Sequence, residues 1–254
     1  MPTDRLERVL ITGGASGIGL AIARAVAESG SKLILIDKDG AGLDGARRDL
    51  AAYGVSVDAI AADLTDAAAL DGALAGAGDV DGLVNCAGIY PVTPSLEMSI
   101  DEWDRVLSLN LRAPFLLSRG FAKRLIERKK GGAIVNISST ASVLARPGIA
   151  HYGASKAALN QLTRVLAVEL APHDIRVNAV LPGVIGTETV KGSLTTPESR
   201  AEMDAKMARI PLGRLGTPEE IAKLVVFLLS GAASYSTGGL FAADGGFSLG
   251  IARY

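Results

Sequence analysis

Short apolar runs alternate with amphipathic stretches along the whole chain. Runs rich in Val, Ile, Leu and Ala, bounded by Gly or Asp, predict buried strands. These strands are expected at residues 8–12, 32–37, 55–61, 82–86, 133–138, 175–181 and 239–243. Between them apolar residues recur at helical spacing, and the predicted helices lie near residues 17–29, 41–52, 66–76, 101–128, 151–171 and 218–230.

This alternation of strands and helices predicts the fold class. Strands that are apolar throughout must be covered on both faces, so we expect an α/β fold with a doubly wound, Rossmann-like parallel sheet of seven strands and helices on both sides. No linker or shift in composition divides the 254 residues, so we predict a single domain spanning 1–254. The polar segment 184–211, with a short helical stretch near 198–208, departs from the pattern. We predict that this segment is a mobile lid over a site.

Composition and charge narrow the classes of partner. The formal net charge is −1 and no stretch is rich in Lys and Arg, so we expect a small-molecule partner, and neither nucleic acid nor an anionic membrane. Cys86 is the only cysteine and His151 and His173 are the only histidines, so we expect no disulfide framework and no Cys/His metal site. Residues 1–10 lack the apolar core of a signal peptide, and the longest apolar run, 224–229, is too short to cross a bilayer. We therefore expect a cytoplasmic protein.

A glycine-rich turn follows the first predicted strand. It reads TGGASGIG over residues 12–19 and leads directly into an amphipathic helix. Glycines in such a turn let the backbone approach a pyrophosphate, which the positive end of the helix then stabilises. Asp37 stands eighteen residues beyond Gly19, at the end of the second strand. Its carboxylate can accept hydrogen bonds from an adenosine ribose and would repel a 2′-phosphate, so we predict that the cofactor is NAD.

A second motif is the pair Tyr152 and Lys156, four residues apart on a predicted helix. That spacing puts both side chains on one face of the helix, about one turn apart. A tyrosine with its usual pKa of about 10 becomes a useful base only if something stabilises the phenolate. Two unit charges about 4 Å apart at an effective dielectric constant of about 20 interact by roughly 4 kcal/mol, or about three pKa units. We therefore predict that Lys156 lowers the pKa of Tyr152.

The spacing within these two motifs resembles that of the short-chain dehydrogenase/reductase family. The matching patterns are Gly13-x3-Gly17-x-Gly19 and Tyr152-x3-Lys156. The resemblance covers the whole chain, and its further matches are Asp63-Leu64, Asn85-Cys86-Ala87-Gly88, Asn110, Ser139, Pro182-Gly183 with Thr187, and Asp244-Gly245-Gly246. The family usually has Asn where this chain has Cys86, and we interpret the small thiol as a packing residue.

The resemblance implies a catalytic set made of Asn110, Ser139, Tyr152 and Lys156. Tyr152 would exchange the proton of the substrate hydroxyl while a hydride passes between the substrate carbon and the nicotinamide. Lys156 would bind the nicotinamide ribose hydroxyls, and Ser139 would bond the substrate oxygen. Asn110, which interrupts a long helix, would hold a water that links Lys156 to solvent. The family's spacing of thirteen residues before the tyrosine selects Ser139 over the neighbouring Ser138.

The resemblance also implies which residues bind the cofactor. Asp63 and Leu64 would meet the adenine, residues 85–88 would line the adenosine ribose, and Ile185 with Thr187 would hold the carboxamide. The full predicted set is Gly13, Ser16, Gly17, Ile18, Gly19, Asp37, Asp63, Leu64, Asn85, Ala87, Gly88, Tyr152, Lys156, Pro182, Gly183, Ile185 and Thr187.

Several other polar residues invite a functional interpretation. His151 adjoins Tyr152, yet consecutive helical side chains point about 100° apart, so we interpret it as a helix-start residue, with a substrate contact as the alternative. Glu102 and its acidic neighbours open a predicted helix, where carboxylates complement the helix dipole. Arg146 and Tyr90 fall on loops that we expect to border the substrate cleft.

These features favour an NAD-dependent oxidoreductase that transfers a hydride between the cofactor and a secondary alcohol. Overall resemblance to bacterial polyol and sugar dehydrogenases favours a polyol or sugar as substrate. A 3-oxoacyl carrier-protein reductase is an alternative with the same catalytic residues, although such reductases typically carry Arg or Lys where this chain has Ser16. A non-catalytic dinucleotide sensor would have little use for the Ser, Tyr and Lys set, and an extended-branch epimerase would need a larger C-terminal domain.

Two long predicted helices, 101–128 and 151–171, indicate self-association. The second helix is apolar around more of its circumference than contact with one sheet requires. The C-terminal run 247–251 is apolar too, and such a chain end usually frays unless something holds it, so we expect a second interface there. The resemblance to the family supplies the number of subunits, so we predict a homotetramer.

Overall fold

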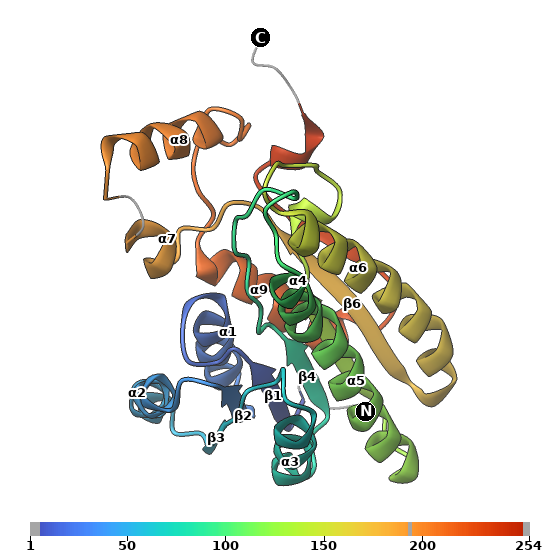
Figure 1. Ribbon diagram of the computed structural model, residues 1–254. Coiled ribbons are helices and arrows are strands. Elements are labelled where there is room, and N and C mark those ends of the chain that lie inside the picture. Colours follow the sequence, from blue (N-terminus) through green and yellow to red (C-terminus); the bar gives the residue numbers. More distant parts are fainter. Residues whose placement is uncertain (1–5, 193–194, 251–254) are drawn as a thin grey trace.

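The predicted strands form one parallel sheet, in the order β3-β2-β1-β4-β5-β6-β7. The computed structural model describes residues 6–192 and 195–250, so residues 1–5, 193–194 and 251–254, which the predicted domain, lid and C-terminal interface include, lie outside it. The doubly wound sheet with helices on both faces is confirmed (Figure 1). The strands are β1 Arg8–Thr12, β2 Lys32–Asp37, β3 Val57–Ala61, β4 Gly82–Asn85, β5 Gly132–Ile137, β6 Ile175–Pro182 and β7 Leu240–Ala243.

Helices cover the two faces of the sheet in two groups. One face packs against α1 Gly17–Glu28, α2 Gly40–Leu50 and α9 Pro218–Leu229. The other face packs against α3 Ala67–Ala77, α5 Ala113–Glu127 and α6 Ala150–Leu170.

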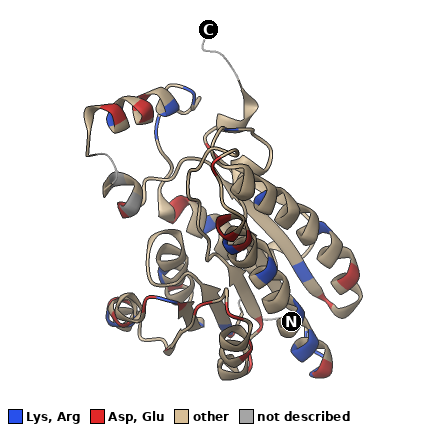
Figure 2. Cartoon of the chain, viewed as in Figure 1, with Lys and Arg blue, Asp and Glu red and all other residues tan. Residues whose placement is uncertain are grey.

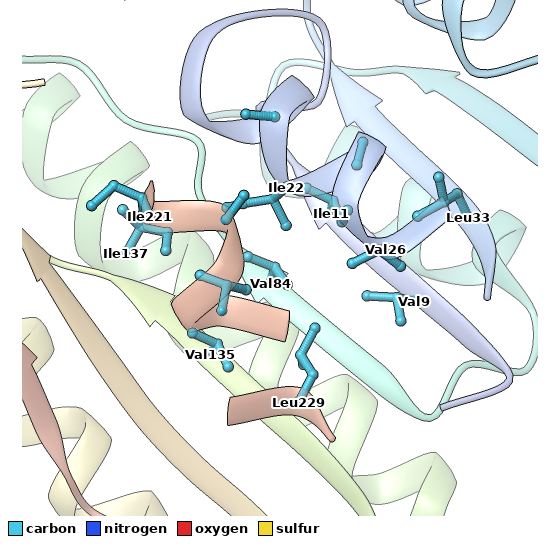
Figure 3. Packing of buried hydrophobic residues seen from close by; sticks show 14 of the residues in the cluster. Val9, Ile11, Ile22, Val26, Leu33, Val84, Val135, Ile137, Ile221 and Leu229 are labelled. Carbon is cyan, nitrogen blue, oxygen red and sulfur yellow. The ribbon is translucent and has the colours of Figure 1, made fainter. Parts of the chain in front are cut away.

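The alternation of side chains along each strand builds the two halves of the core. In β1, Val9 and Ile11 point to the face that carries α1 and α9, whereas Leu10 between them points to the face of α5 and α6. Ile22 of α1 and Ile221 of α9 pack in the first cluster, as Figure 3 shows. Because each strand is apolar on both faces, its sequence is a continuous apolar run.

The long helix predicted at 101–128 is broken into three parts. The structure has α4 Ile100–Leu107, a π-helical turn at Ser108–Arg112, and then α5. Pro114, four residues after Asn110, has no N–H to donate to the Asn110 carbonyl, so regular α-helical bonding cannot pass through this point. The sequence prediction that Asn110 interrupts the helix is consistent with this geometry.

The segment predicted as a lid contains two helices, α7 Glu188–Gly192 and α8 Pro197–Met207. The sequence predicted the second near 198–208 and missed the first. Figure 1 shows α8 extending away from the sheet beyond α7. Thr196 caps α8, and its hydroxyl accepts the N–H of Ser199 at 3.2 Å.

Charged residues of both signs are interspersed along the helices and loops (Figure 2). Across residues 6–192 and 195–250, no helix has the length and apolar character needed to cross a membrane. In the same ranges, no three His, Cys, Asp or Glu side chains are grouped so that they could hold a metal ion.

Candidate active site

The glycine-rich turn between β1 and α1 has the shape of an anion cradle. Gly13 and Gly17 adopt positive φ angles of 71° and 54°, which L side chains rarely adopt. A Cβ atom on Gly19 would collide with the carbonyl oxygen of Gly13, so only glycine allows the turn to fold back on itself. Ser16 is the N-cap of α1 but makes no side-chain capping hydrogen bond, so the first turn, which includes Ile18, has no side-chain acceptor. These N–H groups suit a phosphate.

Thr12, the last residue of β1, ties this turn to the end of β4. Its hydroxyl oxygen accepts the N–H groups of Cys86 at 3.0 Å and Ala87 at 3.1 Å. The approach is so close that a Cβ atom on Gly13 would lie 3.0 Å from the Cα of Ala87. Sequence reasoning missed this role of Thr12. Its only signal was a hydroxyl residue at the end of an apolar strand, directly before the glycines.

The acidic residues predicted for the adenosine end lie at the ends of β2 and β3. Asp37 faces the glycine-rich turn, and its carboxylate accepts the N–H of Ala15 at 3.2 Å. Asp63 accepts the N–H and the hydroxyl of Thr65 at 2.9 and 2.8 Å, and these bonds lower the pKa of its carboxyl group. Leu64 is buried beside it. The predicted adenosine-binding residues are thus collected at one edge of the sheet.

The side chain of Asn85, one of the residues predicted to line the adenosine ribose, belongs to a buried hydrogen-bond network. The amide nitrogen donates to Ser118 Oγ at 3.2 Å and to Asn136 Oδ1 at 2.8 Å, and Asn136 in turn donates to Thr163 Oγ1 at 2.9 Å. This buried polar network joins β4, β5, α5 and α6. The side-chain oxygen of Asn85 has no hydrogen-bond partner in this network.

The four predicted catalytic residues meet at the carboxyl edge of the sheet. The Ser139 side chain hydrogen-bonds to the Tyr152 phenol, and Lys156 Nζ lies 5.8 Å from the centre of the Tyr152 ring. Lys156 Nζ also donates to the Ile137 carbonyl at 2.7 Å. This end of the sheet is where open α/β folds bind their ligands.

Asn110 connects the π-helical turn to the rest of the site. Its side chain accepts the N–H of Ile89 at 3.0 Å, and it donates to the Ile89 carbonyl at 2.9 Å and to Ser155 Oγ at 3.3 Å. A Cβ atom on Gly88 would lie 3.2 Å from Asn110 Oδ1 and 3.6 Å from Lys156 Nζ. Asn110, Gly88 and Lys156 are therefore neighbours.

Burial dominates the acid–base properties of the site. Desolvation raises the pKa of Tyr152, and the Ser139 hydrogen bond works against it. Desolvation also lowers the pKa of Lys156 to about 8. This corrects the expectation from the sequence, because the Tyr152 pKa is raised and not lowered. The physical reason is that the same burial that brings the two groups together disfavours both of their charged forms.

Comparison with known proteins identifies the family. A family profile described as enoyl-(acyl carrier protein) reductase matches residues 13–248. The chain is 43% identical over 245 residues to galactitol 2-dehydrogenase (L-tagatose-forming) of Cereibacter sphaeroides, covering 94% of each protein. The chain belongs to the short-chain dehydrogenase/reductase family. Its relatives are dehydrogenases and reductases of CH–OH groups, and it is an oxidoreductase of the same kind.

Two solved structures of similar proteins hold different cofactors. A proposed NAD(P)-dependent gluconate 5-dehydrogenase from Beutenbergia cavernae, with NADP at low occupancy, is 38% identical with a TM-score of 0.88 and covers 95% of this chain and 96% of its own. A 4-hydroxyisoleucine dehydrogenase complexed with NADH is 33% identical with a TM-score of 0.88, covering 96% of this chain and 100% of its own. The family resemblance thus extends to a nicotinamide cofactor.

Of the two residues predicted to hold the carboxamide, Thr187 lies beside the glycine-rich turn and Ile185 lies at the base of the lid. A Cβ atom on Gly17 would lie 3.6 Å from Thr187 Cγ2, so Thr187 lies close to the turn. Ile185 pairs with Gly216 as an isolated β-bridge at the base of the lid. Pro182 ends β6, and a Cβ atom on Gly183 would lie 2.7 Å from Asp244 Cα. These close contacts pack the segment between β6 and the lid against the glycine-rich turn, Gly216 and Asp244.

The other residues that the sequence singled out lie at different distances from Tyr152. The Tyr90 ring lies 5.7 Å from the Tyr152 ring, at an interplanar angle of 52°. Ile185 lines a cavity of about 530 Å³ between the lid base and β7, and Arg146 lines another of about 380 Å³; Tyr152 lines neither. His151 is fully buried and contacts Glu102, so the alternative that it contacts substrate is wrong.

Proposed function

We propose that the protein is an NAD-dependent dehydrogenase that oxidises a secondary alcohol, or reduces the matching ketone, with Tyr152 as general acid/base. The observation that carries this proposal is the grouping of Ser139, Tyr152 and Lys156 at the carboxyl edge of the sheet, next to a turn that suits a pyrophosphate. We infer that the whole chain works as one domain, with residues 184–211 as a lid over this edge.

The chain's own residues fit a nicotinamide dinucleotide. The turn from Gly13 to Gly19 would hold the pyrophosphate at the open N-terminus of α1, and Asp37 would bond the adenosine ribose. Thr187, which lies beside the turn, and Ile185 would hold the carboxamide. When bound, the nicotinamide would supply or accept the hydride.

Tyr152 would take the proton from the substrate hydroxyl. Ser139 already bonds the phenol, so a substrate oxygen that bonds both residues would be fixed before the proton moves. Lys156, with a pKa of about 8, keeps its positive charge in most molecules at neutral pH and would stabilise the phenolate as it forms. Asn110 would hold a water in the path of the proton through its main-chain carbonyl, which Pro114 leaves without its usual donor.

NAD rather than NADP is proposed on the strength of Asp37 and Ser16. A 2′-phosphate would lie close to the Asp37 carboxylate, and the two negative charges would repel each other. An Arg or Lys at position 16 could offset that repulsion, but this chain has Ser16. Lys38 adjoins Asp37 and is the nearest cation in sequence, so the proposal concerns the ratio of specificity constants for the two cofactors.

A polyol or sugar is the proposed substrate class, because galactitol, L-xylulose and gluconate are named for relatives of this chain. A 3-oxoacyl carrier-protein reductase remains the second candidate, favoured by the description of the matching family profile. The test is the absorbance of NADH with galactitol, xylitol, gluconate and a 3-oxoacyl thioester. Turnover of a polyol or sugar acid with NAD is expected. Preferred reduction of the thioester would select the second candidate, and no turnover of any compound would select a dinucleotide sensor.

We also propose a homotetramer that works in the cytoplasm. Val168 and Val165 of α6 are 77% and 41% exposed, and Phe115 of α5 is 39% exposed, so apolar side chains project from the helix pair where we expect a partner. Leu249, near the C-terminus, is 70% exposed and marks the second proposed interface. The free thiol of Cys86 and the large oxidised NAD pool are compatible with a cytoplasmic enzyme.

A further inference from the structure

Tyr152 lies in the first turn of α6, where backbone N–H groups have no acceptor within the helix. The N-cap residue Ile149 has no side-chain oxygen and makes no capping hydrogen bond. Instead, His151 Nδ1 accepts the backbone N–H of Tyr152 at 2.8 Å. A histidine that precedes the tyrosine thus replaces the missing cap, and it holds the tyrosine's own main chain.

The other ring nitrogen of His151 is fixed by a carboxylate on a different helix. His151 is fully buried, and its Nε2 lies 3.0 Å from Glu102 Oε1 of α4. Because Nδ1 accepts a hydrogen bond, the neutral ring carries its proton on Nε2 and donates it to Glu102. Both nitrogens are therefore engaged, and the ring can neither flip nor change tautomer without losing a buried bond.

Glu102 links the same histidine to the two loops that we expect to border the substrate cleft. Its carboxylate also bonds the side chain of Thr93, which follows Tyr90 in the loop between β4 and α4. The N–H of Thr93 donates to the carbonyl of Gly148 at 2.8 Å, in the loop that carries Arg146. Loop, helix and tyrosine thus share one connected set of hydrogen bonds.

We propose that His151, held by Glu102, is a positioning residue for Tyr152. The inference rests on the proposed role of Tyr152 as general acid/base. Proton transfer demands that the phenol oxygen stay within hydrogen-bond reach of the substrate, and small displacements of such a group reduce turnover strongly. The first turn of a helix frays most easily, so a bond to the tyrosine's own N–H is an effective way to hold it.

The test compares variants of His151 that keep either the hydrogen bond to the Tyr152 N–H, the hydrogen bond to Glu102, or neither. His151→Asn keeps an acceptor close to the position of Nδ1, His151→Gln keeps a donor that can reach Glu102, and His151→Leu keeps neither. We expect kcat, on the best substrate of the panel, to fall at least tenfold in His151→Leu and by less than threefold in His151→Asn, with KM for NAD within twofold throughout. His151→Gln should resemble His151→Leu, because the bond to Tyr152 is the one that matters. His173→Leu, which removes the exposed histidine beyond α6, is the matched control and should behave as wild type.

A double variant separates positioning from a general loss of folding. If His151 acts through the phenol, His151→Leu should add no further loss to Tyr152→Phe. An equal tenfold loss in both backgrounds, or kcat within twofold of wild type in His151→Leu, would overturn the inference. Substantial turnover by Tyr152→Phe alone would instead overturn the proposed function, so the two failures are distinguishable. Melting curves of all variants with NADH show whether each is folded and binds cofactor.

Discussion

The Tyr152 phenol hydrogen-bonds to the Ser139 side chain, its ring contacts that of Tyr90, and burial raises the pKa of the hydroxyl. Replacing it with Phe removes one oxygen and preserves the packing of the ring. We expect Tyr152→Phe to lose nearly all turnover while still binding NADH, measured by steady-state rates and by NADH fluorescence. Retention of more than about a tenth of the activity, a barrier change under about 1.4 kcal/mol, would mean that another group handles the proton.

In the proposed function, the Asp37 carboxylate sets the preference for NAD over NADP. Its oxygens accept the N–H groups of Ala15 and Asp39, so the charge is held in place beside the glycine-rich turn. We expect the wild type to prefer NAD by at least about a hundredfold in kcat/KM, equivalent to about 2.7 kcal/mol. Asp37→Ser should narrow this ratio at least tenfold by raising kcat/KM for NADP. Equal wild-type values for the two cofactors would rule the prediction out.

Lys156 illustrates a conflict between stability and the proposed function. Burial depresses its pKa from 10.5 to about 8, so the folded protein binds this proton less tightly than the unfolded chain. The cost is complete below pH 8, about 3 kcal/mol, and it disappears as the pH rises from 8 to 10.5. Lys156→Met removes that cost and also the bond to the Ile137 carbonyl, worth about 1 kcal/mol. We expect this variant to lose turnover and to melt several degrees higher than wild type at pH 7.

The pH dependence provides the check on this assignment. The difference in melting temperature between Lys156→Met and wild type should shrink as the pH approaches 10, because wild type then sheds the buried charge. A lower melting temperature than wild type at pH 7 would show that the ammonium stabilises the fold.

Among the secondary-structure elements, α9 depends on one cation from the neighbouring strand. The Arg176 guanidinium donates to the carbonyls of Leu228, Leu229 and Ser230 and to that of Ala233, at 2.7 to 3.1 Å. Carbonyls at a helix C-terminus have no partner within the helix, and they carry the negative end of its dipole. We expect Arg176→Met to lower the free energy of unfolding by about 2–4 kcal/mol, measured by urea denaturation. Arg176→Lys should recover only a part, because an ammonium cannot fork between several carbonyls.

The bounds of a helix or strand could be predicted where Gly, Asp, Thr or Pro residues mark its ends in the sequence. β1 and β2 match their predicted bounds because each apolar run stops at a Gly, Asp or Thr. The predicted start of β3 at Val55 is two residues early. Ser56 accepts a hydrogen bond from the N–H of Leu33, but the regular pairing with β2 begins at Val57. At the π-helical turn Ser108–Arg112 the sequence offers only Asn110 and Pro114 as signals of a break, and these predict an interruption of the helix but not its π-helical form. Sequence motifs selected the candidate site residues, but they could not reveal that burial raises the pKa of Tyr152.

At the scale of the whole molecule, the apolar side chains of α5 and α6 should be covered by a second subunit. Val168 is the most exposed of them, at 77%. We expect the wild type to be a tetramer by light scattering at micromolar concentration, and Val168→Glu to dissociate into smaller species because a charge would be buried in the contact. Tyr53→Glu, at an exposed residue after α2, is the matched control and should stay a tetramer. A wild-type monomer would contradict the prediction, whereas a wild-type dimer would preserve the α5/α6 contact and remove the C-terminal one.

The strand order has a consequence for how the chain is made. In the described sheet, every pair of neighbouring strands is consecutive in sequence except β1 and β4. The segments 8–61 and 82–243 can therefore each assemble from local pairings as they leave the ribosome, and one strand pair joins them. Until β4 is synthesised, one edge of β1 is open to pairing with other chains. The glycine-rich turn belongs to the first segment and Ala87 to the second, so a dinucleotide bound there would fasten the two halves of the nascent fold together.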